Sequence, residues 1–213
     1  VATCRARGVS RLVWASSTTV LGQQADHAAG LVDETASRFP AGIYGLTKSL
    51  AEEIGTFAHR HWGLEVVAVR PTLVLGPGHP YGGLLDPLKA LFEACHPVAP
   101  LTLEIGWGRH LFDIVHVDDV AAAFVALAAA PPGLRPLYNV NGGTTDIDAI
   151  AALARAARPE LDLTVRDEAP PVVFPRVAAE RIAADIGFRA RYGADETIRR
   201  CIEHARNREE CYV

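Results

Sequence analysis

A strand, a long helix and a second strand follow one another early in the chain, and this order constrains the fold more than any other feature. Residues 11–16 form a short apolar run of strand type, and residues 65–70 form another in which apolar and polar positions hardly alternate. Such a run is typical of a parallel strand that is buried on both faces. Between about 41 and 62 apolar residues recur at helical spacing, and Gly63 follows as a stop signal. The pattern predicts a right-handed βαβ unit in a parallel sheet.

The same signals predict the other elements of the chain. Residues 2–8 look like the end of a helix, and further helices are expected at 84–95, from Asp118-Asp119 to about 130, and at 146–157, 176–186 and 195–208. Extended segments are expected at 101–105, 112–117, 137–140 and 161–166. Pro71 should end the second strand, residues 17–40 and 76–83 read as loops, and Gly142-Gly143 reads as a turn.

Composition argues against two classes of partner. The formal net charge is −4 and the arginines are scattered singly, whereas nucleic-acid binding needs a clustered basic surface. The longest apolar run, residues 120–130, is far shorter than the roughly 20 residues of a membrane span. The four cysteines form no CxxC pair, which favours reduced thiols. We therefore expect a cytoplasmic protein that binds neither nucleic acid nor membrane.

No metal site is expected from the distribution of histidine and cysteine. His59 and His61 lie on a predicted exposed helix face, and no third ligand is near them in the sequence. Cys201, His204 and Cys211 offer ligand groups on the terminal helix, but structural zinc sites take four ligands with tighter spacing.

Tyr44 and Lys48 carry the strongest chemical signal in the chain, because Lys48 is one of only two lysines and lies four residues after a tyrosine. On a helix, residues i and i+4 share one face at about 5–6 Å. A phenol has an unperturbed pKa near 10, and a neighbouring cation favours its ionised form. The pair thus predicts a tyrosine that exchanges a proton near neutral pH, as reversible alcohol oxidation requires.

Ser17 belongs to the loop that leaves the carboxyl end of the first strand, where ligands bind in open parallel sheets. Its hydroxyl can share a substrate oxygen with Tyr44 and donate a hydrogen bond to a developing oxyanion. Tyr44 then exchanges the proton, while Lys48 holds the ribose of a nicotinamide cofactor that supplies the hydride chemistry. The alternative is that Tyr44 and Lys48 are ordinary solvated side chains of a helix surface.

Several ordered motifs resemble the extended short-chain dehydrogenase/reductases, the NAD-dependent epimerase/dehydratase group. They are Trp14-Ala-Ser-Ser17 through Gly22, Tyr44-x-x-x-Lys48, Arg70-Pro71 with Gly76-Pro77-Gly78, His116-Val-Asp-Asp-Val120, Tyr138-Asn-Val140 and Ile186-Gly-Phe188. The resemblance implies an α/β fold, with a Rossmann-like doubly wound parallel sheet and a small mixed α/β C-terminal substrate lobe. It implies NAD or NADP as cofactor, and Ser17, Tyr44 and Lys48 as catalytic residues.

The resemblance also implies how the chain is divided. Residues 1–78 are expected to be the remainder of the NAD(P)-binding Rossmann domain, and residues 79–213 mainly the substrate lobe, with 113–141 returning to the sheet. The implied cofactor contacts are Ala15, Ser16, Tyr44, Lys48, Pro71 and Thr72. The implied contacts to a small-molecule substrate are Thr18, Thr19, Leu73, Arg109 and Phe112.

One family feature is missing from the sequence. No strand followed by G-x-G-x-x-G or a looser relative occurs, and the chain does not begin with Met. We expect the glycine-rich turn, and the residue that chooses NAD or NADP, to precede Val1. The first strand should then show an unpaired edge when this chain stands alone. The family also implies a homodimer through the Tyr44 helix.

The sequence departs from members that act on nucleotide sugars. These usually carry asparagine three places after the arginine of Arg70-Pro71 and arginine four places before His116, whereas this chain has Leu73 and Phe112. Each lost charge-assisted contact to a diphosphate costs on the order of 1.5–3 kcal/mol. The usual tyrosines before Gly22 and Gly76 are leucines here, and four apolar changes in one pocket predict a less polar substrate.

Residues 106–113 and the His116 motif look closer to the 3β-hydroxysteroid dehydrogenase-like and dihydroflavonol reductase-like branches. The first hypothesis is therefore an oxidoreductase acting on a hydroxyl or ketone carbon of an apolar or mixed substrate. A nucleotide-sugar 4-epimerase or 4,6-dehydratase stays open, because Arg109 could swing into the pocket. A non-catalytic dinucleotide-sensing or scaffold protein is the third hypothesis, and the complete set of Ser17, Tyr44 and Lys48 speaks against it.

The His116 motif has a structural interpretation of its own. Asp118 and Asp119, at a predicted helix start, are expected to act as N-caps. His116 either lies near the substrate or packs against the sheet.

Overall fold

The structure, a computed structural model, describes residues 1–28, 30–77 and 86–207. Its α-helices are α1 (Ala2–Ala6), α2 (Ile43–His61), α3 (Asp86–Ala94), α4 (Val117–Ala129), α5 (Ile147–Ala157), α6 (Glu180–Ile186) and α7 (Ala194–Asn207). Its strands are β1 (Arg11–Ala15), β2 (Glu65–Pro71), β3 (Leu73–Leu75), β4 (Thr102–Ile105), β5 (Phe112–His116), β6 (Leu137–Val140), β7 (Gly143–Thr145) and β8 (Asp162–Val165). Two short 3-10 helices are η1 (Thr18–Leu21) and η2 (Gln24–Asp26).

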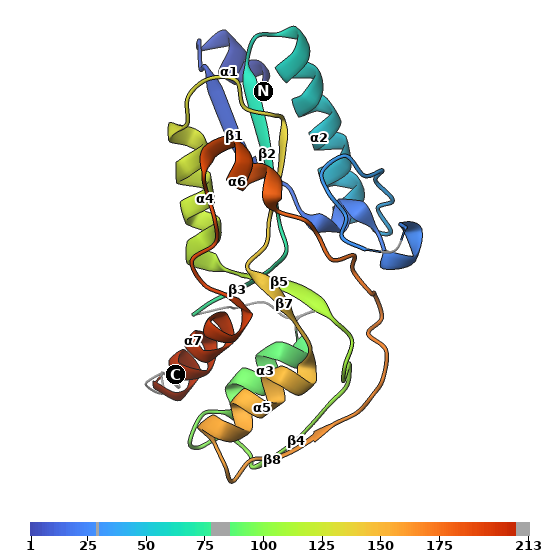
Figure 1. Ribbon diagram of the computed structural model, residues 1–213, viewed down its shortest axis with the longest axis vertical. Coiled ribbons are helices and arrows are strands. Elements are labelled where there is room, and N and C mark those ends of the chain that lie inside the picture. Colours follow the sequence, from blue (N-terminus) through green and yellow to red (C-terminus); the bar gives the residue numbers. More distant parts are fainter. Residues whose placement is uncertain (29, 78–85, 208–213) are drawn as a thin grey trace.

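A three-stranded parallel sheet in the order β1-β2-β6 forms the upper part of the molecule in Figure 1. Its central strand β2 is buried from Val66 to Arg70, as expected of a parallel strand covered on both sides. α2 packs on β2, and α4 packs on β1 and β2. The predicted βαβ unit and the α/β fold with a parallel sheet are confirmed.

Side chains of β2 alternate between two apolar clusters, which shows that the helices cover opposite faces. Val66 packs in one cluster with Ala58 of α2 and with Leu12 and Trp14 of β1. On the other face, Val67 and Val69 pack with residues of α4 and β6, namely Ala123, Leu127, Tyr138 and Val140. This is the doubly wound arrangement, in which helices flank the sheet on both sides.

A second region, the lobe, lies below the sheet in Figure 1 and is built around α3, α5 and α7. Its strands form a sheet in the order β3-β5-β7, in which β5 is parallel to β3 and antiparallel to β7, and a separate parallel pair β4-β8. The buried residues of its core are apolar, and Leu88, Leu91, Ile147, Ile150 and Ile198 are fully buried there.

Arg11 explains how β1, β2 and α4 are held together at the end of the sheet away from the Ser17 loop. Its Nη1 donates to the carbonyl oxygens of Leu127 at 2.9 Å and Ala130 at 2.6 Å, in the last turn of α4. Its Nη2 donates to Glu65 Oε2 at 2.5 Å. A cation at a helix C-terminus satisfies orphan carbonyls and opposes the negative end of the helix dipole.

Several predicted boundaries differ from the structure. The expected loop 17–40 contains η1 and η2, and residues 176–179 precede α6 and are not helical, with Val177 forming a parallel bridge to Val32. The expected turn at Gly142-Gly143 instead starts β7, and β3 was not predicted at all. Both are three-residue strands, which are too short for periodicity to identify. The predicted loop 76–83 and the predicted helices 84–95 and 195–208 extend partly outside the described residues.

β1 is an edge strand of the described sheet, because in this part of the chain it pairs with β2 alone. In the same described residues, no helix combines the length and the apolar character that crossing a membrane requires.

Candidate active site

Ser17 lies directly beyond the carboxyl end of β1, where the chain turns into η1. Its backbone is extended, with φ −162° and ψ 150°, and its side chain caps η1 by accepting from the Thr19 N–H at 3.2 Å. The Thr19 hydroxyl also donates to Ser17 Oγ, at 2.9 Å. In both contacts the Ser17 oxygen is the acceptor, so its hydroxyl proton can still be donated to another oxygen.

Tyr44 and Lys48 lie in the first turns of α2 and meet the end of β1. Lys48 Nζ donates to the carbonyl oxygen of Ala15 at 2.7 Å and lies 5.6 Å from the centre of the Tyr44 ring. It also lies 5.7 Å from the Trp14 ring. The Tyr44 side chain itself is exposed. The structure therefore brings Tyr44 and Lys48 together on one helix face, next to the residue that precedes Ser16 and Ser17.

Gly45 is a packing position next to Tyr44 that the sequence pattern did not single out. A Cβ atom at this residue would lie 2.7 Å from the Thr19 carbonyl oxygen and 3.2 Å from Pro40 Cβ. Only glycine therefore lets the first turn of α2, which carries Tyr44, approach η1 this closely. The available sequence signal was a glycine inside a helical pattern, which usually marks a close approach or a packing constraint.

A buried charge cluster below these residues was also missed. Glu52, one turn beyond Lys48, is 1% exposed and accepts hydrogen bonds from Ser16 Oγ at 2.5 Å and from Arg70 Nε at 2.7 Å. Arg70 Nη2 lies 2.5 Å from the second oxygen of Glu52, and Arg38 Nη1 is 3.1 Å from it. The signal in the sequence was a carboxylate on the sheet-facing side of an amphipathic helix.

The expected cofactor residues lie at the ends of β1 and β2. Ala15 ends β1, Ser16 donates its N–H to Val69 O at 2.7 Å, and Pro71 ends β2 and accepts from Thr18 Oγ1 at 3.3 Å. Thr72 is 7% exposed, and among the described residues its hydroxyl has no hydrogen-bond partner.

The donors at this edge fit the nicotinamide and ribose end of a dinucleotide. The ammonium of Lys48 has three protons and donates one of them to Ala15 O. The Thr72 hydroxyl has no hydrogen-bond partner in the described part of the chain. Both lie at the carboxyl edge of a parallel sheet, where such ligands bind.

The expected substrate residues are spread over several elements. Thr18 is buried in η1, whereas Arg109 follows β4 with a side chain that is 85% exposed and 3.3 Å from Asp148. Leu73 is half-buried against the lobe core, and Phe112 is buried within it. Thr19 is half-buried beside Ser17. Because these positions are Leu73 and Phe112, the chain lacks there the asparagine amide and the arginine guanidinium expected of members that act on nucleotide sugars.

The interpretation that four apolar replacements line one pocket is wrong. Leu21 is fully buried with Val20, Val32 and Val177 beneath the Ser17 loop. Leu75 belongs to the separate core of the lobe, together with Phe112. Burial in two cores is a packing role, which a sequence pattern alone does not distinguish from lining a pocket.

The His116 motif also differs from expectation. α4 begins at Val117, and His116 is its N-cap, with Nδ1 accepting from the Asp118 N–H at 3.1 Å. Asp119 is buried and accepts from the N–H groups of Arg191 and Tyr192 at 2.9 Å and 3.0 Å. The prediction that Asp118 and Asp119 are N-caps is therefore wrong, because the preceding imidazole occupies that position.

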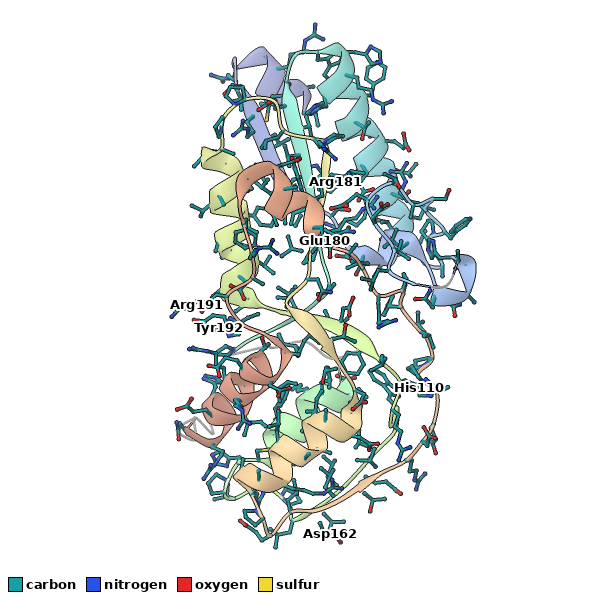
Figure 2. The ribbon with its side chains drawn as sticks, in the orientation of Figure 1. His110, Asp162, Glu180, Arg181, Arg191 and Tyr192 are labelled. Carbon is teal, nitrogen blue, oxygen red and sulfur yellow. The ribbon has the colours of Figure 1, made fainter. Side chains whose placement is uncertain are left out.

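Asp119 instead fastens α4 to the segment that leads into α7. Figure 2 shows Arg191 and Tyr192 between these two helices. His116 is 1% exposed and lies 4.7 Å from the Tyr192 ring, so it packs at the same junction.

No metal cluster is found in the part of the chain that the structure describes, and two of its thiols, Cys95 and Cys201, are buried. No group of three or more His, Cys, Asp or Glu side chains there could hold a metal ion. His59 Nδ1 lies 3.2 Å from Val66 O. Burial raises the pKa of the Cys95 thiol to about 11 and that of Cys201 to about 12, so both stay neutral at physiological pH. Cys211 lies outside the described residues.

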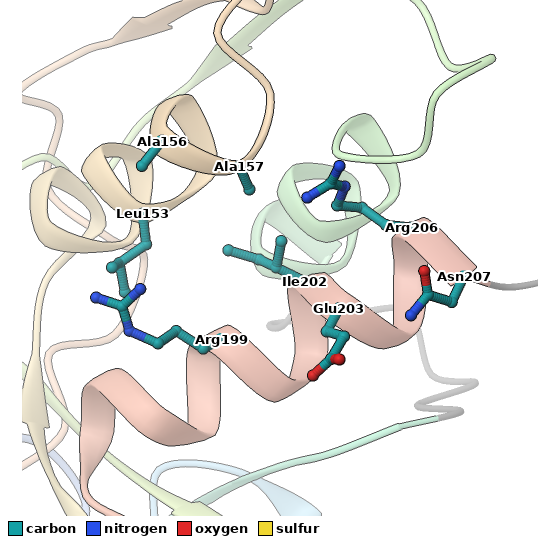
Figure 3. Close-up of a pocket in the computed structure, with 8 residues that line it drawn as sticks. All are labelled: Leu153, Ala156, Ala157, Arg199, Ile202, Glu203, Arg206 and Asn207. Carbon is teal, nitrogen blue, oxygen red and sulfur yellow. The ribbon is translucent and has the colours of Figure 1, made fainter.

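A groove of about 470 Å³ lies elsewhere, between α5 and α7 of the lobe (Figure 3). It is lined by Leu153, Ala156, Ala157, Arg199, Ile202, Glu203, Arg206 and Asn207. None of these residues belongs to the elements that carry Ser17, Tyr44 and Lys48.

A doubly wound sheet with polar side chains at the carboxyl ends of its strands is the arrangement of Rossmann-type dinucleotide-binding folds. Residues 1–141 match the sequence profile of the NAD dependent epimerase/dehydratase family. The chain belongs to this family, whose members are NAD(P)-dependent enzymes.

Curated relatives include reductases. The chain is 34% identical over 139 residues to 2-alkyl-3-oxoalkanoate reductase of Stenotrophomonas maltophilia, a match that covers 62% of this chain and 39% of the relative. It is 27% identical over 179 residues to dihydroflavonol 4-reductase of Zea mays, covering 76% and 45%. The chain thus spans less than half the length of these relatives.

Solved structures share the fold over nearly the whole chain. A GalE-like L-threonine dehydrogenase from Cupriavidus necator superposes with a TM-score of 0.81 at 23% identity, covering 95% of this chain and 67% of that one. MoeE5 in complex with UDP-glucuronic acid and NAD superposes with a TM-score of 0.77 at 27% identity, with the same coverage.

Proposed function

We propose that this chain carries the catalytic residues of an NAD(P)-dependent oxidoreductase that interconverts a substrate alcohol and ketone. The observation that supports it best is the contact of Lys48 Nζ with Ala15 O, which holds the ammonium 5.6 Å from the Tyr44 ring at the carboxyl end of β1. When bound, a nicotinamide dinucleotide supplies or accepts the hydride.

In this proposal each side chain has a separate role. Tyr44 gives its phenol proton to the substrate oxygen during reduction and takes it back during oxidation. Ser17, whose oxygen already accepts two hydrogen bonds from Thr19, donates its own proton to the same substrate oxygen. The Lys48 ammonium stabilises negative charge on the phenol and has two further protons for ribose hydroxyls.

The test is Tyr44→Phe in the full-length gene product. Removing a general acid-base group is expected to lower turnover by about 100-fold to 10,000-fold. Tyr44 is exposed, so the variant should fold, and titration with NAD and NADP should show that cofactor binding is kept. Tyr192→Phe is the matched control, because it lies at the junction with α7 and keeps its ring contacts. Equal turnover of Tyr44→Phe and the parent would remove Tyr44 from the mechanism.

For the substrate we propose an apolar or mixed hydroxy or keto compound. Leu73 and Phe112 provide no side-chain donor for a diphosphate, and the relatives named above include a 2-alkyl-3-oxoalkanoate reductase and a dihydroflavonol 4-reductase. A panel of 2-alkyl-3-oxoalkanoates, dihydroflavonols and UDP-sugars, followed by nicotinamide absorbance at 340 nm, tests this choice. Turnover of the first two classes supports it.

A nucleotide-sugar 4-epimerase or 4,6-dehydratase is the second candidate function. It is favoured by the exposed guanidinium of Arg109 and by the structural likeness to MoeE5, whose structure contains UDP-glucuronic acid. Protection of the protein by UDP-sugars in a thermal-shift panel would favour this candidate, and Arg109→Gln should then abolish the protection. The third hypothesis, a non-catalytic sensor, predicts turnover with none of these compounds.

We also propose a homodimer formed by α2. An apolar stripe on this helix is exposed, and it consists of Ile43, Leu46, Leu50, Ile54 and Phe57. The stripe reads the same in both directions about Leu50, so two antiparallel copies place Ile43 opposite Phe57 and Leu46 opposite Ile54. A surface that matches itself in this way suits a two-fold interface, and antiparallel helix dipoles attract.

Leu50→Glu tests the dimer by placing a carboxylate at the symmetry axis. Sedimentation velocity should show a dimer for the parent protein and a monomer for this variant. Val125→Glu, on an exposed position of α4, is the control and should remain dimeric. A monomeric parent at micromolar concentration would contradict the proposal.

A further inference from the structure

Glu52 is a buried carboxylate to which the proposed reaction assigns no part. It lies on α2 one turn beyond Lys48, and its side chain faces the sheet, as do Gly45, Gly55 and Ala58. Burying a carboxylate is costly unless its oxygens are fully hydrogen-bonded. A buried acid on a helix that is otherwise apolar on that side therefore needs an explanation.

Its hydrogen bonds come from three different segments. Ser16 Oγ, at the end of β1, donates at 2.5 Å, and Arg70 of β2 donates through Nε at 2.7 Å and Nη2 at 2.5 Å. Arg38, in the loop before α2, donates at 3.1 Å. A carboxylate has about four acceptor sites, so these donors occupy them all.

The cluster attaches α2 to the end of β1 at a second point along the helix, one turn beyond the contact of Lys48. Lys48 contacts Ala15, and Glu52 contacts the next residue, Ser16. These two contacts are separated by one helical turn, about 6 Å along the axis. One contact would allow the helix to rotate about it, whereas two fix both its distance and its rotation.

We propose that Glu52 is a positioning residue, which through Ser16 and Arg70 holds the rotation of α2 so that Tyr44 and Lys48 face the Ser17 loop. Its catalytic consequence rests on the proposed function, whereas the positioning itself does not. Displacement of a reacting group by about 1 Å can lower a rate by about 100-fold. The cluster is thus expected to matter for turnover although no member except Ser16 adjoins the reacting residues.

Ser16→Ala is the variant that separates positioning from folding. It removes one arm of the cluster and leaves the Glu52–Arg70 ion pair intact, whereas replacement of Glu52 would leave the Arg70 guanidinium buried without a partner. Thr197→Val is the matched control, because it also deletes a buried hydroxyl, one that has no hydrogen-bond partner in the described part of the chain. Arg38→Met is a second, milder variant, since Arg38 is partly exposed.

Lysine NMR gives a readout that does not depend on activity. The chain has only two lysines, Lys48 and Lys89, so ¹³C labelling at Cε gives two signals. Lys48 lies 5.7 Å from the ring of Trp14, which belongs to β1, and its signal therefore senses the rotation of α2 against the sheet through ring-current shifts. Ser16→Ala and Arg38→Met should move the Lys48 signal and leave that of Lys89 in place, and Thr197→Val should move neither.

Kinetics give the second readout. Ser16→Ala in the full-length gene product should lower kcat by about 10-fold to 100-fold, with a much smaller change in KM. An unmoved Lys48 signal in both folded variants would overturn the positioning role. A moved signal with unchanged kcat would overturn its catalytic consequence. If the parent shows no turnover at all, the proposed function fails while the NMR result still decides the positioning role.

Discussion

The sheet region and the lobe bury their charged side chains differently. Beneath the Ser17 loop, the α2-facing side of the sheet encloses Glu52 and Arg70, both 1% exposed and paired with each other. In the lobe, the buried guanidinium of Arg158, 5% exposed, donates instead to the carbonyl oxygens of Ala94 and His96, beside a large apolar core. Buried charges add little net stability but allow few alternative arrangements, whereas apolar cores add stability and tolerate repacking. The Glu52–Arg70 pair is therefore expected to fix the geometry next to the Ser17 loop, whereas the apolar core of the lobe is expected to contribute mainly stability.

Among the variants that test this comparison, Glu52→Leu is expected to cause the largest loss of stability. It leaves the Arg70 guanidinium, 1% exposed, without its carboxylate, which should lower the free energy of unfolding by about 3–5 kcal/mol. Urea unfolding followed by circular dichroism measures the change. The double variant Glu52→Leu/Arg70→Met should recover much of the loss, and a double variant as unstable as the single one would show that packing, not charge, is responsible.

In the lobe, Ile150→Ala is the corresponding deletion. Ile150 is fully buried in an apolar core, so the change removes methyl groups and leaves a cavity, at a cost of about 2–5 kcal/mol. Ile150→Val, the matched conservative variant, should cost about 0.5–1.5 kcal/mol. Unlike Ser16→Ala and Arg38→Met, neither should move the Lys48 NMR signal, and a shift of that signal would mean that the two regions are coupled.

Gly45→Ala tests the close approach of α2 to η1. Its Cβ would lie 2.7 Å from the backbone oxygen of Thr19, which cannot move as a flexible side chain does, so a cost of about 1–3 kcal/mol is expected. Gly42, the N-cap of α2, has nothing within 4 Å of a new Cβ, so Gly42→Ala is the control and should cost only about 0.5 kcal/mol for the weaker N-cap. A melting temperature for Gly45→Ala at or above that of the parent would contradict the close packing.

The smallest expected effect is electrostatic and lies at the far end of the sheet. Burial raises the pKa of Glu65, but hydrogen bonds from the Gly133 N–H and from Arg11 outweigh it, and the net pKa is below the usual 4.5. A carboxyl whose pKa is lowered in the folded state adds stability above pH 4.5, which is lost as the pH falls through the folded pKa. Glu65→Gln should therefore flatten the stability profile below pH 4.5 in acid titrations followed by fluorescence, with no change in slope near neutrality.

Sequence reasoning identified the sheet region well, and the reason is the length of its elements. The 19-residue α2 and the uninterrupted apolar β2 carry many residues of one period, which a pattern detects directly. The three-residue strands β3 and β7 carry too few residues to show a period. The N-cap of α4 was assigned to Asp118 and Asp119 because carboxylates are the usual caps, whereas a histidine takes the position here.

For the site, the sequence placed Tyr44, Lys48 and Ser17 near one another, because helical spacing and the carboxyl ends of parallel strands are general rules. It did not identify the buried Glu52–Arg70 pair or the close packing of Gly45 beside them. These residues contact partners 18 to 36 positions away, or a backbone oxygen of η1, and no local pattern reports such contacts.

The sequence by itself thus determined the fold class, the family motifs and the pairing of Tyr44 with Lys48, since all of these follow from local spacing. Only the tertiary structure decided which apolar residues belong to a core. Leu21, Leu75 and Phe112 look the same in the sequence whether they line a pocket or fill a core. The tertiary structure also decided that Glu52 is buried and fully hydrogen-bonded. The physical reason is that burial depends on segments distant in sequence, which only folding brings together.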